Sequence, residues 1–434
     1  MRRLVSLTGR ALKAGTTIAV VGLIAHGTFS NRPAKAADPA CDITDPTQTC
    51  NCSDYGLVNP VYMAGSSAVR PVINAISIPL VSAASPITLV YSSTGSCDGV
   101  NSVVSGLALT STATFYKAGA QTQWKCQLSG ETIDVGLADV FPTSCPSITS
   151  SSLTGITDTA GPIQAMNFVT PYASTQNTIS AEAAYLAIGF GADTTKNKTA
   201  WNNPANWAFR NFQSGTETML ATAINVPTGN WPALGSAGDK GSSGGVLNAV
   251  AAASADPETT LGILASNEAD AVLPTGAPHA GESARKYIKR LAYQHYGQQC
   301  AYYPDSSFGS LDKLNVRKGR YAVWGPLHML TKNPSANAQK ALDLITEKQT
   351  LPDVDVVGLE IDNNTIPQCA MTVQRKAEMG PITPYTPDHP CGCFFDSKRG
   401  ETAAANACKD LQCDDDTDCS GTKPACNHGY CEAK

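Results

Sequence analysis

Charged residues are scarce in this chain. Asp, Glu, Lys and Arg make up 15% of its 434 residues, whereas apolar residues make up 42%. This balance excludes a disordered chain, which combines low hydrophobicity with high net charge. The formal net charge is −5, and no block of basic residues follows the first 40 positions. A nucleic-acid partner is therefore not expected, because binding a row of phosphates requires a row of Lys and Arg side chains.

Signatures of metal-dependent and nucleotide-dependent enzymes are also missing. The chain has no HExxH motif, no GxxxxGK[ST] motif and only six histidines. His295 and His328 have no nucleophile at motif spacing, so we expect both to be structural. The basic stretch from Lys286 to Arg290 is typical of the end of a surface helix. We expect no catalytic residue, no metal and no cofactor. A secreted hydrolase is the lowest-ranked alternative, with a carboxylate pair drawn from Glu182, Glu217 and Glu268.

The N-terminus has the features of a secretory signal peptide. Basic residues from Arg2 to Lys13 precede an apolar stretch from Thr16 to Ala25, and Ala34-Lys35-Ala36 offers a cleavage site. The apolar stretch is shorter than the roughly 20 residues that a membrane-spanning helix needs. We therefore expect residues 1–36 to be removed and the mature chain to have no membrane span. Removal of six basic residues gives a mature charge of −5 − 6 = −11. The expected location is the periplasm or the cell surface.

Fifteen cysteines lie beyond that segment, and an exported chain with so many cysteines is expected to contain disulfides. The odd number leaves at least one thiol without an intramolecular partner. Three cysteines lie in a short N-terminal segment at 37–53, and seven lie in a tail at 386–434 that has few aliphatic residues. Such a tail cannot bury enough apolar surface to fold without disulfides.

Two metal sites are weaker alternatives for the tail. His428 lies between Cys426 and Cys431, but the CxxC pairs of structural zinc sites are missing. The acidic run from Asp414 to Asp418 lacks the glycine and the final glutamate of an EF-hand calcium loop. We therefore expect disulfides and a solvated acidic loop.

The body of the chain alternates strands and helices. Each of four apolar runs is followed by a turn of Ser, Thr, Gly or Asp and then, in most cases, by an amphipathic stretch. The apolar runs lie at 58–63, 87–91, 132–137 and 207–210. This alternation predicts an α/β fold with a parallel sheet. Turns of this kind present backbone N–H groups and hydroxyls at helix N-termini, which favour bound anions. The segments 112–116 and 123–128 predict an inserted hairpin, and 238–245 predicts a turn before a helix at 246–252.

Five segments resemble, in order, the ligand-binding motifs of one protein family. They are AGSSAVRP, SSTGSCDGV, DVGLADVFP, FRNFQSGT and DPETTLGILASNEAD. They resemble those of the phosphate-binding subunit of bacterial phosphate ABC transporters, within the type 2 periplasmic solute-binding family, over residues 57–345. The resemblance implies a two-lobed fold with crossover strands near Gly161 to Thr170 and near Leu261 to Ala271. Lobe I would comprise 54–165 and 271–385, and lobe II would comprise 166–270.

The resemblance also implies a ligand, a partner and a site. The ligand would be phosphate or a related oxyanion, and the partner would be the membrane subunit of an ABC transporter. In this family Arg210 would pair with the anion, and Asp139 would accept a hydrogen bond from a protonated phosphate. The matching ligand contacts are Ser67, Ala68, Ser96, Asp139, Arg210, Ser214, Gly215 and Thr216.

The chain departs from the family motifs at several positions. Phe212 replaces an aspartate that contacts phosphate, which predicts looser selectivity and a reshaped cleft. Ala68 replaces the usual phenylalanine, and Asp98 places a negative charge beside Ser96. A second class of function is therefore kept: a cell-surface adhesive or structural protein that uses the same scaffold with a lost or different ligand.

Overall fold

The computed structural model describes residues 41–146, 148–232, 238–270, 287–352, 354–400 and 403–433. The expected signal peptide lies outside these residues. None of the helices in the described part of the chain has the length and apolar character that crossing a bilayer requires.

A first sheet is built around the strands predicted from the sequence. Its strands, in spatial order, are β1 (Cys50–Asn51), β5 (Trp124–Gln127), β4 (Thr112–Phe115), β3 (Thr88–Ser92), β2 (Pro60–Gly65), β6 (Val135–Ala138), β13 (Trp324–Thr331) and β7 (Thr157–Pro171). The three central strands β3, β2 and β6 are parallel. All side chains of β3 and β6 are buried, as expected for parallel strands with both faces covered.

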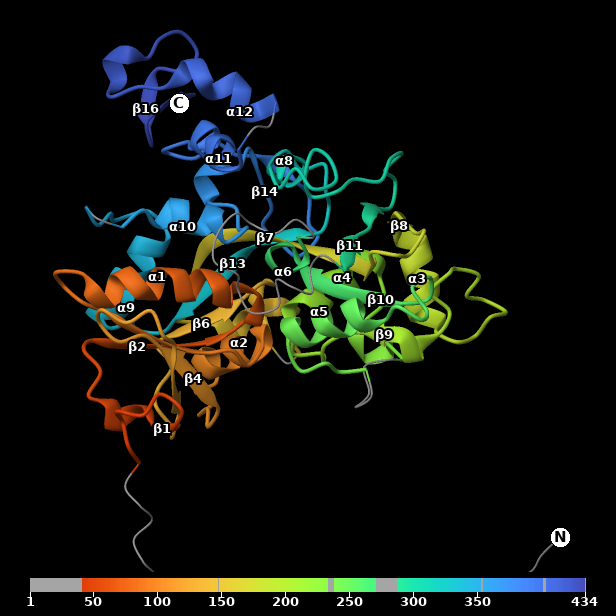
Figure 1. Ribbon diagram of the computed structural model, residues 1–434, viewed down its shortest axis with the longest axis horizontal. Helices are drawn as coiled ribbons and strands as arrows, with labels where there is room; N and C mark the ends of the chain where they lie inside the picture. Colours follow the sequence, from red (N-terminus) through yellow and green to blue (C-terminus); the bar gives the residue numbers. More distant parts are fainter. Residues whose placement is uncertain are drawn as a thin grey trace, which may run out of the picture. The chain divides into compact units, whose positions relative to one another are not determined.

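Helices pack against these central strands. α1 (Arg70–Ser82) contacts β3, α2 (Ser96–Val104) contacts β6 and β2, and α9 (Ala336–Ile345) contacts β2 and β7. The apolar spacing of α1 explains its position, because Val72, Ile73, Ile76 and Leu80 fall on one helical face and are all buried. Figure 1 shows α1 and α9 beside this sheet.

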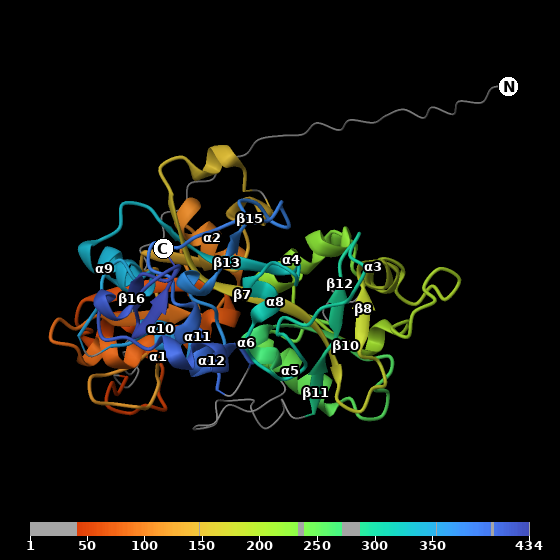
Figure 2. The same ribbon diagram turned by 90° about the horizontal axis from the view of Figure 1, so that it is seen from above.

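β7 is shared by two sheets. Its residues 157–165 pair with β13, and its residues 166–171 pair with β10 (Leu261–Ala265) and β11 (Ile288–Arg290). β10 also pairs with β9 (Trp207–Ala208), which completes a second sheet. Figure 2 shows β7 running from the region of β13 to that of β10. The chain thus leaves the first sheet along β7 and returns to it through β13, which confirms the predicted two-lobed α/β fold.

The predicted position of the second crossover is occupied by β10. This strand pairs with β7 at Met166 to Val169, whereas the strand that pairs with both β6 and the first part of β7 is β13. β12 (Ala292–Gln294) pairs with β8 (Thr178–Ser180). Part of the segment 271–385, which was expected in lobe I, therefore contacts the segment 166–270, which was expected in lobe II. The exact lobe boundaries stay a prediction.

The second sheet carries its own helices and core. α4 (Gly215–Ile224) packs against β7 and β10, α5 (Ser243–Ala252) packs against β10 and β9, and α3 (Ala181–Phe190) packs against α4. The side chains buried between α5 and the sheet include Val169, Ala208, Val246, Leu247, Val250, Leu264 and Ile288. α6 (Ser266–Ala269) follows β10 directly.

The expectation of a surface helix end at 286–290 is wrong for residues 287–290, whereas Lys286 lies outside the described residues. β11 occupies this region, and Arg290 is 1% exposed. Its guanidinium pairs with Asp270 and Asp305, and Lys313 pairs with the same two carboxylates. A basic run by itself predicts solvent exposure. Nothing local in the sequence reveals Asp270 and Asp305, the carboxylates that make burial of Arg290 possible.

The disulfide prediction is confirmed. The pairs are Cys41–Cys50, Cys52–Cys126, Cys97–Cys145, Cys369–Cys391, Cys393–Cys408, Cys413–Cys426 and Cys419–Cys431, and Cys300 is the free thiol. The predicted hairpin is β4 and β5, and Cys52 attaches it to the N-terminal segment. All seven tail cysteines are in disulfides, three pairs within the tail and Cys391 with Cys369, so their sulfurs are not free thiolates that could bind zinc.

Short elements complete the C-terminal part of the chain. They are α8 (Leu314–Arg317), α10 (Val356–Asp362), β14 (Val373–Gln374), β15 (Thr383–Pro384), α11 (Gly392–Lys398), α12 (Ala403–Cys408), β16 (Ala425–Asn427) and β17 (Tyr430–Glu432). α11 packs against α10, α12 and β17. The tail is therefore connected to the body through α10 and α11 (Figure 1).

Candidate functional site

The first sheet presents hydroxyls and a carboxyl group at one edge. The parallel strands β2, β3 and β6 end at this edge, and Ser66, Ser96 and Asp139 follow these three ends. The Ser66 hydroxyl donates to Asp139 Oδ2, and the Ser96 hydroxyl donates to the same oxygen over 3.5 Å. The Asp139 backbone N–H donates to Ser96 Oγ over 3.2 Å. Three loops therefore form one hydrogen-bonded cluster around Asp139.

A buried arginine follows β9 of the second sheet. Arg210 is 4% exposed, and its backbone N–H donates to Glu217 Oε1 over 2.8 Å. Glu217 lies in the first turn of α4, whose N-cap is Ser214, so this helix begins beside Arg210. Helix N-termini carry a partial positive charge and unpaired N–H groups. The guanidinium and the helix start therefore favour negative charge in the same region.

Hydrogen bonds join the two sheets at this site. Arg210 Nη1 donates to Ser67 Oγ, which also lies 3.0 Å from Ser243 Oγ at the start of α5. The Cys97 N–H, in the first turn of α2, donates to the carbonyl of Gln213 over 3.1 Å. We call the set Ser66, Ser67, Ser96, Asp139, Arg210, Gly215 and Ser243 the interlobe cluster.

Gly215 allows the two sheets to approach closely. A Cβ atom at this position would lie 2.4 Å from Ser96 Oγ and 3.2 Å from Asp139 Cβ. Such distances are too short for a methyl group, so the approach of α4 to the first sheet requires a residue without a side chain. The glycine that the family motif places here therefore has a steric reason in this chain.

Burial dominates the electrostatics of the acids in this region. It raises the pKa of Asp139 to about 6, and the Ser66 hydrogen bond and the charge of Arg210 limit this rise. Burial also raises the pKa of Glu217, and the charge of Arg210 again opposes the shift. Asp139 is thus ionised at neutral pH but holds a proton more tightly than an exposed aspartate.

Several buried polar atoms in this region have no hydrogen-bond partner within the described residues. They include Asp139 Oδ1, Arg210 Nε, Ser214 Oγ, Glu217 Oε2 and Asn267 Oδ1. Asn267 reaches the site through its other side-chain atom, because Nδ2 donates to the Ala68 carbonyl. Buried polar groups are normally paired, and leaving one unpaired costs about 1–3 kcal/mol. Both donors and acceptors are therefore available to a polar ligand.

The structure brings most of the predicted contact residues together. Ser67, Ser96, Asp139, Arg210 and Gly215 are members of the interlobe cluster, and Ser214 and Thr216 are buried in the N-terminal turn of α4. Ala68 differs, because its N–H donates to Ser66 Oγ over 3.1 Å and is used inside the turn. The assignment of these residues to a ligand stays a prediction.

Phe212 does not fill the site. Its side chain is 49% exposed, whereas Arg210 and Ser214 on either side of it are buried. The expectation that its bulk reshapes the cleft therefore has no support in the described structure. Asp98 is half-buried, which raises the pKa of its carboxyl, while the charge of Arg210 lowers it.

Sequence reasoning missed four residues of this region: Ser66, Glu217, Ser243 and Asn267. Ser66 precedes a predicted contact directly, and Ser243 lies in Gly241-Ser242-Ser243-Gly244-Gly245, which has the GxSxG pattern of a strained turn before a helix. These letters were a usable signal for a buried serine at a helix start. Glu217 and Asn267 carry no local signal, because their partners lie on other elements.

The GxSxG letters do not come with the partners of a serine hydrolase. Ser243 Oγ lies beside Ser67 Oγ, and no histidine of the described residues is hydrogen-bonded to it. His328 Nδ1 lies 2.8 Å from Asp158 Oδ2, and its Nε2 has no partner in the described structure. His295 Nδ1 lies 3.2 Å from the Tyr293 hydroxyl. The nucleophile and base of a triad are thus not assembled among these residues.

Comparisons with known proteins extend this description. No family model and no curated protein matches the chain. Among solved structures, it is similar to a putative phosphate ABC transporter substrate-binding protein with bound phosphate from Clostridium perfringens, at 12% identity and a TM-score of 0.47, over 71% of this chain and 99% of that one. It is also similar to an ABC-type phosphate transport receptor from Vibrio cholerae, at 12% identity and a TM-score of 0.40, over 71% and 99% of the two chains.

A regulatory protein matches as well. The reduced form of the OxyR regulatory domain from Pseudomonas aeruginosa is 8% identical, with a TM-score of 0.34, over 67% of this chain and 96% of that one. The names of the two transport proteins match the family that the sequence motifs resemble, whereas OxyR is named as a regulatory domain. At these identities and TM-scores the likeness assigns no ligand to this chain.

Proposed function

We propose that the interlobe cluster binds phosphate or a closely related tetrahedral oxyanion. The observation that carries this proposal is the state of Arg210. Its guanidinium is permanently charged and buried, and it forms no direct ion pair with a carboxylate of the described residues, although its charge opposes the rise in the pKa of Asp139, Glu217 and Asp98. A buried charge without a directly paired counter-ion is costly. An anion between Arg210, the serine hydroxyls and the start of α4 offsets this cost, and it provides an acceptor for the unpaired Nε.

The carboxylate of Asp139 favours phosphate over sulfate. Its Oδ2 is engaged by two serine hydroxyls, while Oδ1 has no partner among the described residues. An ionised carboxylate can only accept hydrogen bonds. Phosphate carries a proton at neutral pH and can donate it to Oδ1, whereas fully ionised sulfate has no proton to donate. Sulfate would leave two negative groups facing each other.

Ligand entry requires the two sheets to separate at the cluster. Ser67 Oγ and Ser243 Oγ lie 3.0 Å apart, which is one hydrogen-bond length. The two hydroxyls are thus hydrogen-bonded to each other, and an oxyanion placed between them would replace this contact. The polypeptide segments that join the sheets are β7 and the entry to β13, so we place the hinge there.

We further propose that the protein is exported and works without catalysis. Seven disulfides support an oxidising compartment outside the cytoplasm. An exported oxyanion-binding protein would deliver its ligand to the membrane subunit of an ABC transporter. The alternative is a surface protein that retains this scaffold without the ligand. One observation favours it: the Cys97 N–H donates to the Gln213 carbonyl and so joins the two sheets without a ligand.

A paired mutation experiment tests the proposal. Arg210→Ala removes the guanidinium from the cluster, whereas Arg320→Ala removes an exposed guanidinium as a matched control. By calorimetric titration of phosphate in phosphate-free buffer, we expect Arg210→Ala to weaken binding by about a hundredfold, since charged hydrogen bonds contribute about 1.5–3 kcal/mol each. Arg320→Ala should bind like the wild type. Equal affinity of both variants would remove the proposal.

A further inference from the structure

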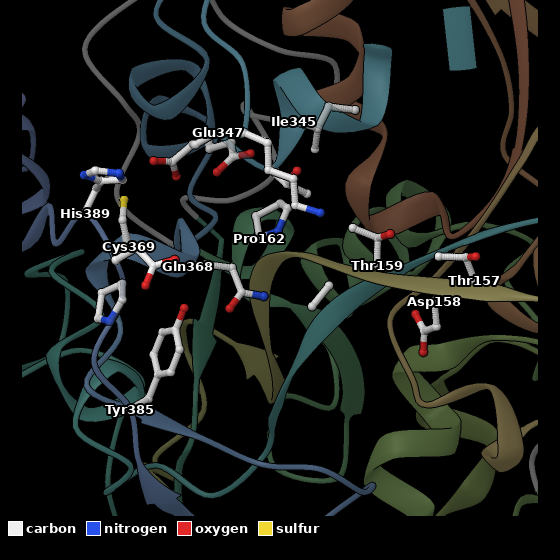
Figure 3. Close-up of a pocket in the computed structure, with 16 residues that line it drawn as sticks. Thr157, Asp158, Thr159, Pro162, Ile345, Glu347, Gln368, Cys369, Tyr385 and His389 are labelled. Atoms are coloured by element: carbon white, nitrogen blue, oxygen red, sulfur yellow. The ribbon is translucent and has the colours of Figure 1, made fainter. Parts of the chain in front are cut away.

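A large pocket lies away from the interlobe cluster. It has a volume of about 740 Å³ and is lined by the first part of β7, the end of α9 with the following loop, α10 and the segment 385–389. Figure 3 shows Asp158 and Pro162 on the β7 side, with Glu347, Tyr385 and His389 on the other segments. Pockets for small organic ligands commonly have 300–1,000 Å³. The volume therefore suits an organic molecule better than a bare ion.

Negative charge predominates on the pocket wall. Four carboxyl groups line it: Asp158, Glu347, Glu360 and Asp388. Among the lining residues, the permanently charged cation is Lys348, whose side chain is exposed. Asp158 is paired with His328, which leaves Glu347, Glu360 and Asp388 as the other carboxyl groups of the wall. The wall is therefore suited to a positively charged ligand.

Glu360 is the most informative residue in this pocket. Its side chain is 1% exposed, and Oε1 has no hydrogen-bond partner within the described residues. A buried, unpaired carboxyl oxygen costs free energy, so natural proteins rarely retain one without a function. Because Glu360 lines the pocket, a ligand with an N–H donor can provide the missing partner.

The opposite side of the pocket supplies a second carboxylate. Glu347 lies two residues after α9, and its Oε2 is 3.7 Å from His428 Nε2 of the tail. Burial raises the pKa of Glu360, and the charge of Glu347 adds to this rise, so the two carboxyl groups interact electrostatically. A cation placed between them would replace this repulsion by two attractive interactions.

We propose that this pocket binds a small organic cation. Its ammonium group would lie between Glu360 and Glu347, and its carbon atoms would contact Pro162, Ile345 and Tyr385, which provide apolar and aromatic surface. The proposal is independent of phosphate binding, because none of the pocket residues belongs to the interlobe cluster.

The protonation of Glu360 gives the proposal a specific signature. Burial, with added repulsion from Glu347 and Asp355, holds the pKa of Glu360 well above its ordinary value of 4.5. The basic side chains of the adjacent α11 are engaged elsewhere, since Lys398 pairs with Asp362 and Arg399 donates to the Ile361 carbonyl. A bound cation stabilises the ionised carboxylate, so binding should release a proton.

Calorimetric titration of the full chain with n-butylammonium at pH 8 tests this proposal. Runs in two buffers of different ionisation enthalpy measure the protons released. Neutral n-butanol, calcium and zinc serve as comparison ligands. We expect n-butylammonium to bind with release of up to one proton. Glu360→Gln should weaken binding about ten- to a hundredfold and abolish the proton release.

The variants separate binding from folding. Glutamine has the size and shape of the Glu360 side chain, so Glu360→Gln should keep the thermal unfolding midpoint of the wild type. Glu347→Gln should also weaken n-butylammonium binding, whereas Glu182→Gln, an exposed change on α3, should not. No binding of n-butylammonium, equal binding of n-butanol, binding of the metals alone, or unchanged affinity in Glu360→Gln would each overturn the proposal.

Discussion

Arg210 Nη1 donates a hydrogen bond to Ser67 Oγ, although 143 positions separate these residues in the chain. Ser67 follows β2 in the first sheet, and Arg210 follows β9 in the second sheet. The contact thus joins the donor groups of both sheets at one point. It places a permanent positive charge where the turns after three parallel strands present their hydroxyls and N–H groups.

The contact between α4 and the first sheet at Gly215 has no room for a methyl group. Gly215→Ala would place a Cβ atom 2.4 Å from Ser96 Oγ, so α4 would have to move away from the first sheet. We expect phosphate affinity to fall by about tenfold or more, because a displacement of about 1 Å disturbs several charged hydrogen bonds. Gly244→Ala is the matched control, since its new Cβ atom would have its nearest neighbour at 3.9 Å. Titration calorimetry on both variants distinguishes them, and equal losses would argue against the steric explanation.

Asp139 should reduce stability while it supports binding. Its pKa is about 6 in the folded chain, above the value of 3.8 for an unperturbed aspartate. The folded state therefore binds the proton more tightly, and the contribution of this group to the free energy of unfolding falls as the pH rises from about 4 to about 6. Above pH 6 the penalty is fully present and amounts to about 1–3 kcal/mol.

Asp139→Asn should remove this penalty. We expect the variant to be more stable than the wild type at pH 8, with a smaller difference at pH 4, in urea unfolding at both values. It should also lose discrimination between phosphate and sulfate, since an amide can donate to either anion. A variant that is destabilised at pH 8 would show that the Asp139 carboxylate is paired better than its surroundings indicate.

The disulfide next to Ser96 links binding and stability. Cys97–Cys145 closes a loop of 48 residues, whereas Cys41–Cys50 closes one of 9. Chain entropy predicts losses of about 4 kcal/mol and about 2.5 kcal/mol when the respective pairs are replaced by alanine. Since Cys97 follows Ser96 directly, we expect replacement of Cys97–Cys145, but not of Cys41–Cys50, to weaken phosphate binding. Denaturant unfolding and calorimetry check both effects, and a loss of affinity in the second variant would contradict the local explanation.

The buried cluster of four charges should be a major determinant of stability. Lys313→Met leaves Asp270 and Asp305 with Arg290 as their remaining cation, at a cost of about 3–5 kcal/mol. Lys398→Met removes a partly exposed partner of Asp362 and should change the free energy of unfolding by less than about 1 kcal/mol. Similar urea unfolding midpoints for Lys313→Met and Lys398→Met would mean that Lys313 contributes little to the free energy of unfolding.

The sequence predicted those features that depend on local pattern. The strands β2, β3 and β6 appear as apolar runs, and the polar residues that follow them meet at one edge because the strands are parallel. The order of the motifs identified Ser96, Asp139 and Arg210, which the structure brings together. The cysteines of an exported chain predicted disulfides, and their odd number predicted at least one thiol without an intramolecular partner, which is Cys300.

Features that depend on long-range pairing could not be predicted in this way. Arg290 was expected at the surface because Asp270 and Asp305, which neutralise it, lie on other elements. The pairing of β13 with both β6 and β7 could not be predicted either, since β10 has an equally apolar sequence. Glu360 carries no motif, and its significance comes from burial and from a pocket whose walls are distant in sequence.

The most direct test of the central claim is a titration of the mature, ligand-stripped protein with phosphate and then with sulfate at pH 8 and fixed salt. The interlobe cluster predicts phosphate binding with a micromolar or lower dissociation constant and sulfate binding that is about a hundredfold weaker, as expected when one charged hydrogen bond is lost. Absence of heat with both anions would contradict the claim and favour a surface protein that retains the scaffold without the ligand.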